Sequence, residues 1–306
     1  MYSAPPSVVA EEFTRVPREL LVNDRPSPWS QALSGRHTVP FFLEGPSFDR
    51  QGNLWVVDIP WGRIFRIAPD GTFALVCTYE GEPNGLKFHA DGRAFITDYR
   101  RGLMVLDPAT GAIETLIDRA HLEGFRGLND LHFSPEDGTL WFTDQGHSGL
   151  HDPYGRLFRL DPDGTLHLQL GGLPSPNGLV LDGAGNTLYV AMTRDNSVWR
   201  VPLRPNRGVG RVGRFVSLSG GIGPDGMAMD SAGNLAVCHP GVGSVWLFDP
   251  AGEPLLRIKS PTGRMTTNCA FGGAEGRHLY IVESETGSIL RAECPAPGAP
   301  MFSHKQ

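Results

Sequence analysis

The stretch from Glu44 to Gly71, EGPSFDRQGNLWVVDIPWGRIFRIAPDG, contains three short apolar runs separated by a Gly-containing turn and a loop. This order is typical of strand, turn, strand, loop, strand and turn. Five later stretches of the chain repeat it, and in each the position that matches Glu44 carries a small polar or acidic residue. The chain is therefore organised as six related units, and the position of Glu44 is where we look for function.

Each unit is marked by a polar residue that is followed, four places later, by an apolar residue. The six units begin at Glu44 (EGPSF), Asn84 (NGLKF), Asn129 (NDLHF), Asn177 (NGLVL), Asp225 (DGMAM) and Thr267 (TNCAF). A spacing of 40 to 48 residues between units is typical of propeller blades rather than of helical solenoids. We predict an all-β fold, a six-bladed β-propeller with four-stranded antiparallel blades, formed by residues 1–306 as a single domain.

The last unit ends after its third strand, near Cys294, while one apolar stretch before the first unit, Val8 to Val16, has no partner. Residues 1–40 are otherwise Pro-rich and irregular. We predict that this N-terminal strand completes the last blade. It would close the ring and cover a strand edge that would otherwise be exposed.

Composition narrows the class of partner and the compartment. A formal net charge of -6 provides no basic surface for a phosphate backbone, so nucleic acid is not an expected partner. The four cysteines lack CxxC spacing, and we expect buried free thiols in a reducing compartment. No run of about 18 apolar residues and no signal-peptide pattern is found in the sequence. We expect a cytoplasmic protein without a membrane partner, either a monomer or a homodimer.

In a propeller the six key residues would surround one mouth of the central channel, because each begins the innermost strand of its blade. Glu44 and Asp225 are carboxylates, three others are Asn amides, and Thr267 is a hydroxyl. Hard oxygen donors of this kind suit Ca²⁺, Mg²⁺ or Mn²⁺. Any one Asn-Gly or Asp-Gly pair can be an ordinary turn, but six polar residues at matching positions favour a shared metal site.

The loops between the second and third strands of the blades would surround the same mouth, and they supply further candidates. Trp61 and Tyr99 are candidates to stack on a sugar ring, with packing between blades as the alternative. His147 lies in the longest of these loops, where it would either bind sugar hydroxyl groups or remain a solvent-exposed histidine. His239 follows a second strand and is predicted to face the pocket.

The blocks EGPSF, LNDLHF with the following LWFTD, SPNGLVL and GPDGMAMD resemble the SMP-30/gluconolactonase/LRE family. Members of that family are six-bladed propellers that hydrolyse sugar lactones with a bound divalent metal. The resemblance extends from Glu44 to about Cys294. It implies one divalent metal ion, with Ca²⁺ as the first expectation and Zn²⁺, Mn²⁺, Mg²⁺ or Fe²⁺ as alternatives.

The resemblance also implies roles for individual residues. It makes Glu44, Asn177 and Asp225 metal ligands, with Asn129 in contact with metal or substrate. The predicted substrate site then comprises Asn84, Asn129, Asp130, Trp61, Tyr99, His147 and His239.

Opening a lactone requires a polarised carbonyl group and a delivered water molecule. A divalent metal stabilises the developing oxyanion and lowers the pKa of bound water, while a carboxylate accepts the proton. We assign that role to Asp225, with direct nucleophilic attack by Asp225 as the alternative. The leading hypothesis is a metal-dependent aldonolactone hydrolase. The alternatives are a hydrolase of other lactones or of phosphotriesters, and a non-catalytic propeller that binds calcium or another ligand.

Overall fold

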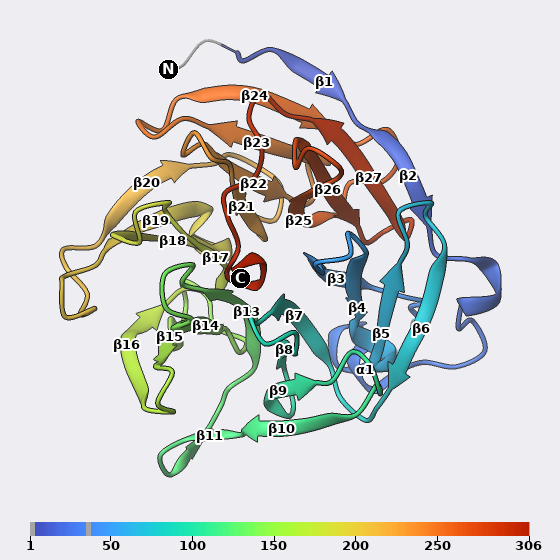
Figure 1. Cartoon of the computed structure of the whole chain (residues 1–306), viewed down its shortest axis with the longest axis horizontal. Coiled ribbons are helices and arrows are strands. Elements are labelled where there is room, and N and C mark those ends of the chain that lie inside the picture. The colour runs from blue at the N-terminus through green and yellow to red at the C-terminus, as the bar shows by residue number, and fades with distance from the viewer. Residues whose placement is uncertain (1–3, 35–37, 306) are drawn as a thin grey trace.

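Six twisted sheets stand around a central axis in the computed structural model of the chain, which describes residues 4–34 and 38–305 (Figure 1). Within each sheet the strands follow one another in chain order and pair antiparallel, except where N-terminal strands join the last two sheets. This is the six-bladed β-propeller that the repeats predict.

The first three blades each consist of four consecutive strands. Blade one contains β3 (Leu43–Phe48), β4 (Leu54–Asp58), β5 (Arg63–Ile67) and β6 (Phe73–Thr78). Blade two contains β7 (Pro83–Phe88), β8 (Ala94–Asp98), β9 (Gly102–Leu106) and β10 (Ile113–Ile117). Blade three contains β13 (Leu128–Phe133), β14 (Leu140–Asp144), β15 (Gly155–Leu160) and β16 (Leu166–Leu173), after a hairpin of β11 (Arg119–Ala120) and β12 (Glu123–Gly124).

The remaining three blades continue the pattern. Blade four contains β17 (Pro176–Leu181), β18 (Thr187–Met192), β19 (Ser197–Pro202) and β20 (Gly213–Ser217). Blade five contains β21 (Met227–Met229), β22 (Leu235–His239), β23 (Ser244–Phe248) and β24 (Pro254–Lys259). Blade six contains β25 (Thr266–Gly272), β26 (His278–Glu283) and β27 (Ser288–Glu293). Every innermost strand begins within two residues of the polar position that marks its repeat.

The N-terminal segment closes the ring with two strands. β2 (Glu11–Arg15) pairs antiparallel with β27 and becomes the fourth strand of blade six, so the predicted closure is confirmed. β1 (Ser7–Val9) pairs parallel with β24 at the rim of blade five, which corrects the expectation of one continuous strand. The predicted strand is interrupted at Ala10, where the N-terminal segment passes from blade five to blade six. The Ala10 side chain is buried between these two blades.

The helical segments are short and lie outside the sheets. They comprise α1 (Pro28–Ser34) and the 3-10 turns Arg18–Leu20, Ile59–Trp61, Thr193–Asp195 and Phe302–His304. Across residues 4–34 and 38–305 no helix has the length and apolar character needed to cross a membrane.

The hydrophobic core lies between neighbouring blades, because both faces of each sheet are covered. Trp55 of β4 packs with Leu86 and Ile96 of blade two. Trp141 of β14 packs in the same way against Leu179 of blade four. All four cysteines are free thiols, and three of them are buried. The tight packing between blades fixes the positions at which the innermost strands meet the channel.

Buried carboxylates at the ends of the second strands fix the loops that enter the innermost strands. Asp58, Asp144 and Glu283 are completely buried. Asp58 accepts hydrogen bonds from the Phe42 backbone N–H and from Arg63 Nε, both at 2.7 Å, and the other two also accept backbone N–H groups. Since a buried carboxylate requires its charge and acceptor capacity to be satisfied, these acids serve the scaffold of the mouth.

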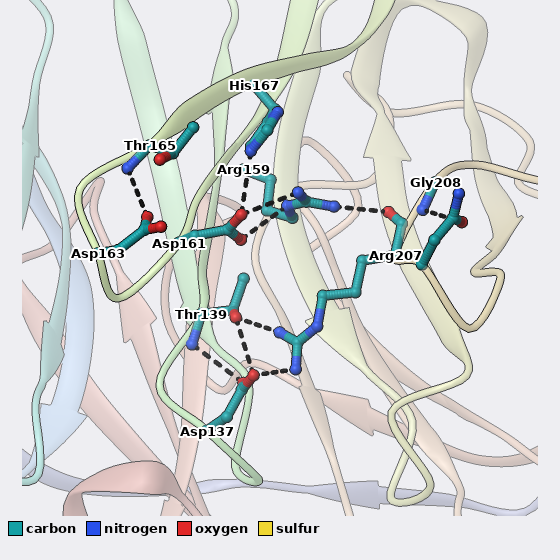
Figure 2. A network of polar contacts seen from close by, with 10 residues as sticks. Asp137, Thr139, Arg159, Asp161, Asp163, Thr165, His167, Arg207 and Gly208 are labelled. Atoms are coloured by element: carbon teal, nitrogen blue, oxygen red, sulfur yellow. Dashed lines mark hydrogen bonds and ion pairs between the residues drawn. The ribbon is translucent and has the colours of Figure 1, made fainter.

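Blades three and four are also tied together on the opposite face of the ring, as Figure 2 shows. The Arg207 guanidinium contacts Asp137 and Thr139 in the turn between β13 and β14. Arg159 donates to the Arg207 carbonyl oxygen at 3.0 Å and forms an ion pair with Asp161 at 2.9 Å. These contacts hold the long loop of blade four against blade three.

Candidate active site

The key residues are placed by hydrogen bonds that pass from each blade to the next. Hydroxyl groups of four blades donate to backbone carbonyl groups at or immediately before the key position of the following blade. The pairs are Thr97 with Asn129 (2.5 Å), Thr143 with Asn177 (2.9 Å), Thr193 with Pro224 (2.8 Å) and Ser284 with Leu43 (2.7 Å). The start of each of these innermost strands is thus fixed against its neighbour.

Two carboxylates, Glu44 of blade one and Asp225 of blade five, lie close enough to interact electrostatically at this end of the channel. Burial raises the pKa of Glu44 to about 7, against the hydrogen bonds that its carboxylate accepts from Gly45 and Asn268. Burial raises the pKa of Asp225 well above its usual range, and the charges of Glu44 and Asp130 add to this effect. Raised pKa values at two interacting acids mean that their charged forms are costly in the folded protein unless a positive charge lies beside them.

A second layer of the site contains Asp130 and Asn268, which directly follow the key positions of blades three and six. Asn268 Nδ2 donates to Glu44 Oε2 at 2.9 Å and lies 3.4 Å from Asp130 Oδ2. Asn268 is 3 % exposed and Asp130 is 3 % exposed. Side chains from opposite blades therefore meet across the channel axis, and Asn268 connects two of the acids.

Asn268 is a site residue that the sequence analysis missed, because it assigned the blade-six position to Thr267. Thr267 also contacts Glu44, and its hydroxyl helps to lower the pKa of that carboxyl against the effect of burial. A signal for Asn268 does exist in the repeats, since the residue after the key position is Gly in four units and is Asp130 or Asn268 in the other two. A Cβ at Gly226 would lie 2.1 Å from the Asn268 side chain. The glycines therefore leave the space that the two side chains fill.

Asn129 is oriented by an amide network that was not predicted. Its Nδ2 donates to Gln145 Oε1 at 2.8 Å, and Gln145 Nε2 donates to the Ser175 hydroxyl at 2.9 Å. Asn129 is buried at the key position of blade three, with its backbone held by Thr97. With its nitrogen engaged in this way, the amide oxygen is the atom that Asn129 offers to a cation or substrate.

The donor set fits a hard divalent cation. Glu44, Asn177 and Asp225 provide two carboxylates and an amide, Asn177 hydrogen-bonds to Asp225, and Asn129 adds a second amide. Within the described part of the chain, no three His, Cys, Asp or Glu side chains converge closely enough to form a metal site by themselves. Carboxylate and amide oxygens without nitrogen or sulfur ligands favour Ca²⁺, Mg²⁺ or Mn²⁺ over a thiophilic metal.

The structure separates the other predicted substrate residues into two groups. The first group remains near the mouth. Asn84 begins blade two and is half-buried, and the Tyr99 ring packs edge-on against the His147 ring, with the ring centroids 5.7 Å apart. Trp61 Nε1 donates to a backbone carbonyl in the N-terminal segment at 3.0 Å. His239 is 1 % exposed, and both of its ring nitrogens are engaged by protein groups. The prediction that His239 faces the pocket is therefore not supported, because its ring fixes a loop instead.

Comparison with known proteins shows the family of the chain. Residues 42–285 match the family model described as the SMP-30/gluconolactonase/LRE-like region, and the chain belongs to that family. It is 33 % identical over 282 residues to a gluconolactonase of Zymomonas mobilis, covering 82 % of this chain and 78 % of that protein. It is 30 % identical over 275 residues to lactonase drp35 of Staphylococcus epidermidis, covering 81 % of this chain and 82 % of that protein.

Among solved structures, a gluconolactonase from Xanthomonas campestris superimposes with a TM-score of 0.74 at 25 % identity. The match covers 95 % of this chain and 99 % of that one.

Proposed function

We propose that this chain is a metal-dependent lactone hydrolase that acts on sugar lactones. The observation that carries the proposal is the group of three acids, Glu44, Asp130 and Asp225, at one end of the channel among amide oxygens. Glu44 and Asp130 are buried and Asp225 is half-buried. The relatives named gluconolactonase and lactonase support the reaction class. An uncompensated set of carboxylates is costly in a fold without a bound cation, and a hydrolase that uses a metal accounts for that cost.

The protein's own residues would divide the work as follows. Glu44, Asn177 and Asp225 would hold the cation with Asn129, and the cation would stabilise negative charge on the lactone carbonyl oxygen. Asp225, whose carboxyl pKa is raised, would accept a proton from the attacking water. The water oxygen bonds to the carbonyl carbon, the ring C–O bond breaks, and the proton passes to the ring oxygen. The product is a hydroxy acid.

Asn268 and Asn129 would act as positioning groups in this scheme. Asn268 holds the Glu44 carboxylate at 2.9 Å and limits its rotation. Asn129 presents its oxygen because Gln145 holds its nitrogen. We place this activity in the cytoplasm, since four free thiols, three of them buried, suit a reducing compartment.

The test measures acid release from glucono-1,5-lactone and from a panel of pentono-, hexono- and aliphatic lactones by pH-stat titration. We expect turnover that a chelator abolishes and that calcium or another divalent ion restores. Asp225→Asn should keep the fold and lose most of the activity, whereas Asp70→Asn, in an exposed turn of blade one, should match the parent. Metal binding without turnover of any lactone would instead support a non-catalytic binding propeller.

The two roles considered for Asp225 are separable. A single turnover in ¹⁸O-labelled water places the label only in the product if water attacks the lactone directly. If Asp225 attacks the lactone carbonyl carbon, the ring C–O bond breaks and a mixed anhydride forms; water that attacks the Asp225 carboxyl carbon of this anhydride places the label in the Asp225 carboxylate. Mass spectrometry of the peptide that contains Asp225 distinguishes these results.

A further inference from the structure

The channel has a second, separate cavity at its other end. This cavity of about 560 Å³ is lined by innermost strands and by turns such as Asp49–Gly52 and Asp182–Gly183, which lie on the face opposite the candidate active site. The C-terminal segment Gly298–Lys305 forms its remaining wall. Figure 1 shows the C-terminus at the centre of the ring. Because Glu44 and Asp225 do not line this cavity, it is distinct from the site described above.

The C-terminal segment is fixed across this end of the channel. The Ala299 backbone N–H donates to the Met229 carbonyl oxygen at 2.9 Å. Arg50 donates to the carbonyl oxygens of Ser303 and Lys305, both at 2.6 Å. The segment thus spans from blade five to blade one and makes a defined wall.

Two polar side chains from neighbouring blades lie at the inner end of the cavity. Lys87 of β7 is 8 % exposed and His132 of β13 is 7 % exposed. The Lys87 ammonium donates to the Pro46 carbonyl oxygen at 3.1 Å, and no described carboxylate lies within ion-pair distance of it. Among residues 4–34 and 38–305, no group forms a hydrogen bond or ion pair with the His132 ring. A buried ammonium ion with only one neutral acceptor is incompletely satisfied.

The charges around the cavity favour an anion at this point. Burial and the Lys87 charge lower the pKa of His132 to about 3, so at neutral pH its ring is uncharged and can donate one N–H. Burial raises the pKa of Asp130, which lies further along the channel toward the candidate active site, and the Lys87 charge opposes that effect. The charged side chains of the cavity rim are Asp49, Arg50, Glu136, Asp182 and Lys305. Lys87 is therefore the cation at the buried end.

The remaining lining is largely apolar. Val180, Met229, Phe271 and Met301 contribute to it from three blades and from the C-terminal segment. Apolar walls with a few convergent polar groups are typical of small-molecule sites. We propose that this cavity binds a small carboxylate with an apolar body, held by Lys87 and His132 at its carboxylate and by the apolar wall along its chain.

The test titrates octanoate into the full-length calcium-loaded protein at pH 7 and follows the methionine methyl signals by NMR. Met229 and Met301 line the cavity, whereas Met192 and Met265 do not. We expect saturable shifts for the first pair and none for the second. Lys87→Met should weaken binding at least tenfold, and Lys87→Arg should retain it because the charge remains.

Two further variants separate loss of the site from loss of the fold. Lys259→Met removes an exposed lysine on β24 and should bind octanoate like the parent. Ala270→Leu narrows the cavity wall and should weaken binding with Lys87 in place. The proposal fails if no methyl signal shifts saturably, if 1-octanol binds as tightly as octanoate, or if Lys87→Met binds like the parent. It also fails if Asp225→Asn abolishes the shifts, since octanoate would then occupy the metal centre.

Discussion

Replacing Glu44 with Gln should stabilise the metal-free protein at pH 8 and, at the same time, weaken metal binding. Burial raises the pKa of the Glu44 carboxyl from an ordinary 4.5 to about 7 in the folded protein. Between these values the folded state holds a proton that the unfolded chain has lost. The stability of the parent is therefore greatest below the unfolded pKa and falls as the pH rises through that window.

The size of the effect follows from the same values. The interval from 4.5 to about 7 corresponds to about 3 kcal/mol of unfolding free energy at pH 8, at about 1.4 kcal/mol per pH unit. Gln carries no charge, and its amide oxygen can accept the bonds from Gly45 and Asn268. Since 1 kcal/mol moves the Tm of a large domain by roughly 2–4 °C, Glu44→Gln should melt roughly 6–12 °C above the parent at pH 8. At pH 4 the two should melt together.

Thermal melts in chelator between pH 4 and pH 8 provide the assay. Burial also raises the pKa of Asp58 to about 6. Asp58 therefore makes the Tm of the parent and of the variant fall with pH by the same amount, and its effect cancels when the two Tm values are subtracted. Asp91, whose pKa is lowered to about 2 with Arg93 as a hydrogen-bond partner, titrates below the window. Added calcium should raise the Tm of the parent and leave the variant unchanged.

The control is Glu275→Gln, an exposed turn residue of blade six, which should follow the parent curve. A variant that melts at or below the parent at pH 8 without metal would refute the reasoning. Parallel pH curves for parent and Glu44→Gln would refute it as well, because the Glu44 charge would then carry no cost in the folded state.

Three other changes test the site and the closure of the ring. Asn268→Leu leaves two buried carboxylates without their shared donor, and calorimetry should show metal affinity lower by about 10- to 100-fold. Gly226→Ala places a methyl group 2.1 Å from the Asn268 side chain, so differential scanning calorimetry should show that the unfolding free energy falls by about 1–3 kcal/mol. Gly213→Ala is the control: open space surrounds Gly213, and this change should leave the stability unaltered. Deleting the residues up to and including Arg15 exposes the edges of β24 and β27. Size-exclusion chromatography should then show self-association, and thermal melting should show a lower Tm. A deletion variant that melts like the parent would contradict the closure of the ring by β2.

The six blades could be predicted because their signals are local and repeated. Each unit shows the same turn residues and the same alternation of apolar runs, so six weak patterns reinforce one another. The division of the N-terminal segment at Ala10 could not be predicted in this way. It depends on the distance between the outer edges of blades five and six, and the residues of β1 and β2 do not indicate that distance.

The key positions of the candidate site could be predicted from the repeats, and Asp130 from the family resemblance, but Asn268 could not. Glu44, Asn177 and Asp225 each occupy the same place in a repeat, so topology alone brings them to one mouth. Asn268 was missed because the repeat places Thr267 at the key position. The pairing of β25 with β26 shifts between Thr266 and Asn268, as the pairing of the innermost strand also does in blades one to four. Such a bulge lets two consecutive residues approach the axis, whereas a regular strand alternates its side chains between faces.

His239 is a residue that the sequence placed in the site but that the structure places in the scaffold. Its position at the end of a second strand is the same as that of Asp58 and Asp144, which serve the scaffold. The Gly220 carbonyl oxygen at 2.9 Å and Trp246 Nε1 at 3.2 Å occupy its two ring nitrogens. Both partners come from other segments of the chain, so sequence position alone does not reveal that the ring is already engaged.

The closing strand of the ring sets the order of events when the protein is made. β2 is translated before any of the blades, yet Glu11 pairs with Arg291 and Arg15 with Ser288, which follow the first five blades in the chain. The preceding β1 likewise waits for β24. Five blades therefore leave the ribosome before the ring can be sealed, and contacts so distant in sequence form slowly. Until then the rims of blades five and six are open edges, so nascent chains depend on rapid closure, or on a chaperone, to avoid pairing with one another.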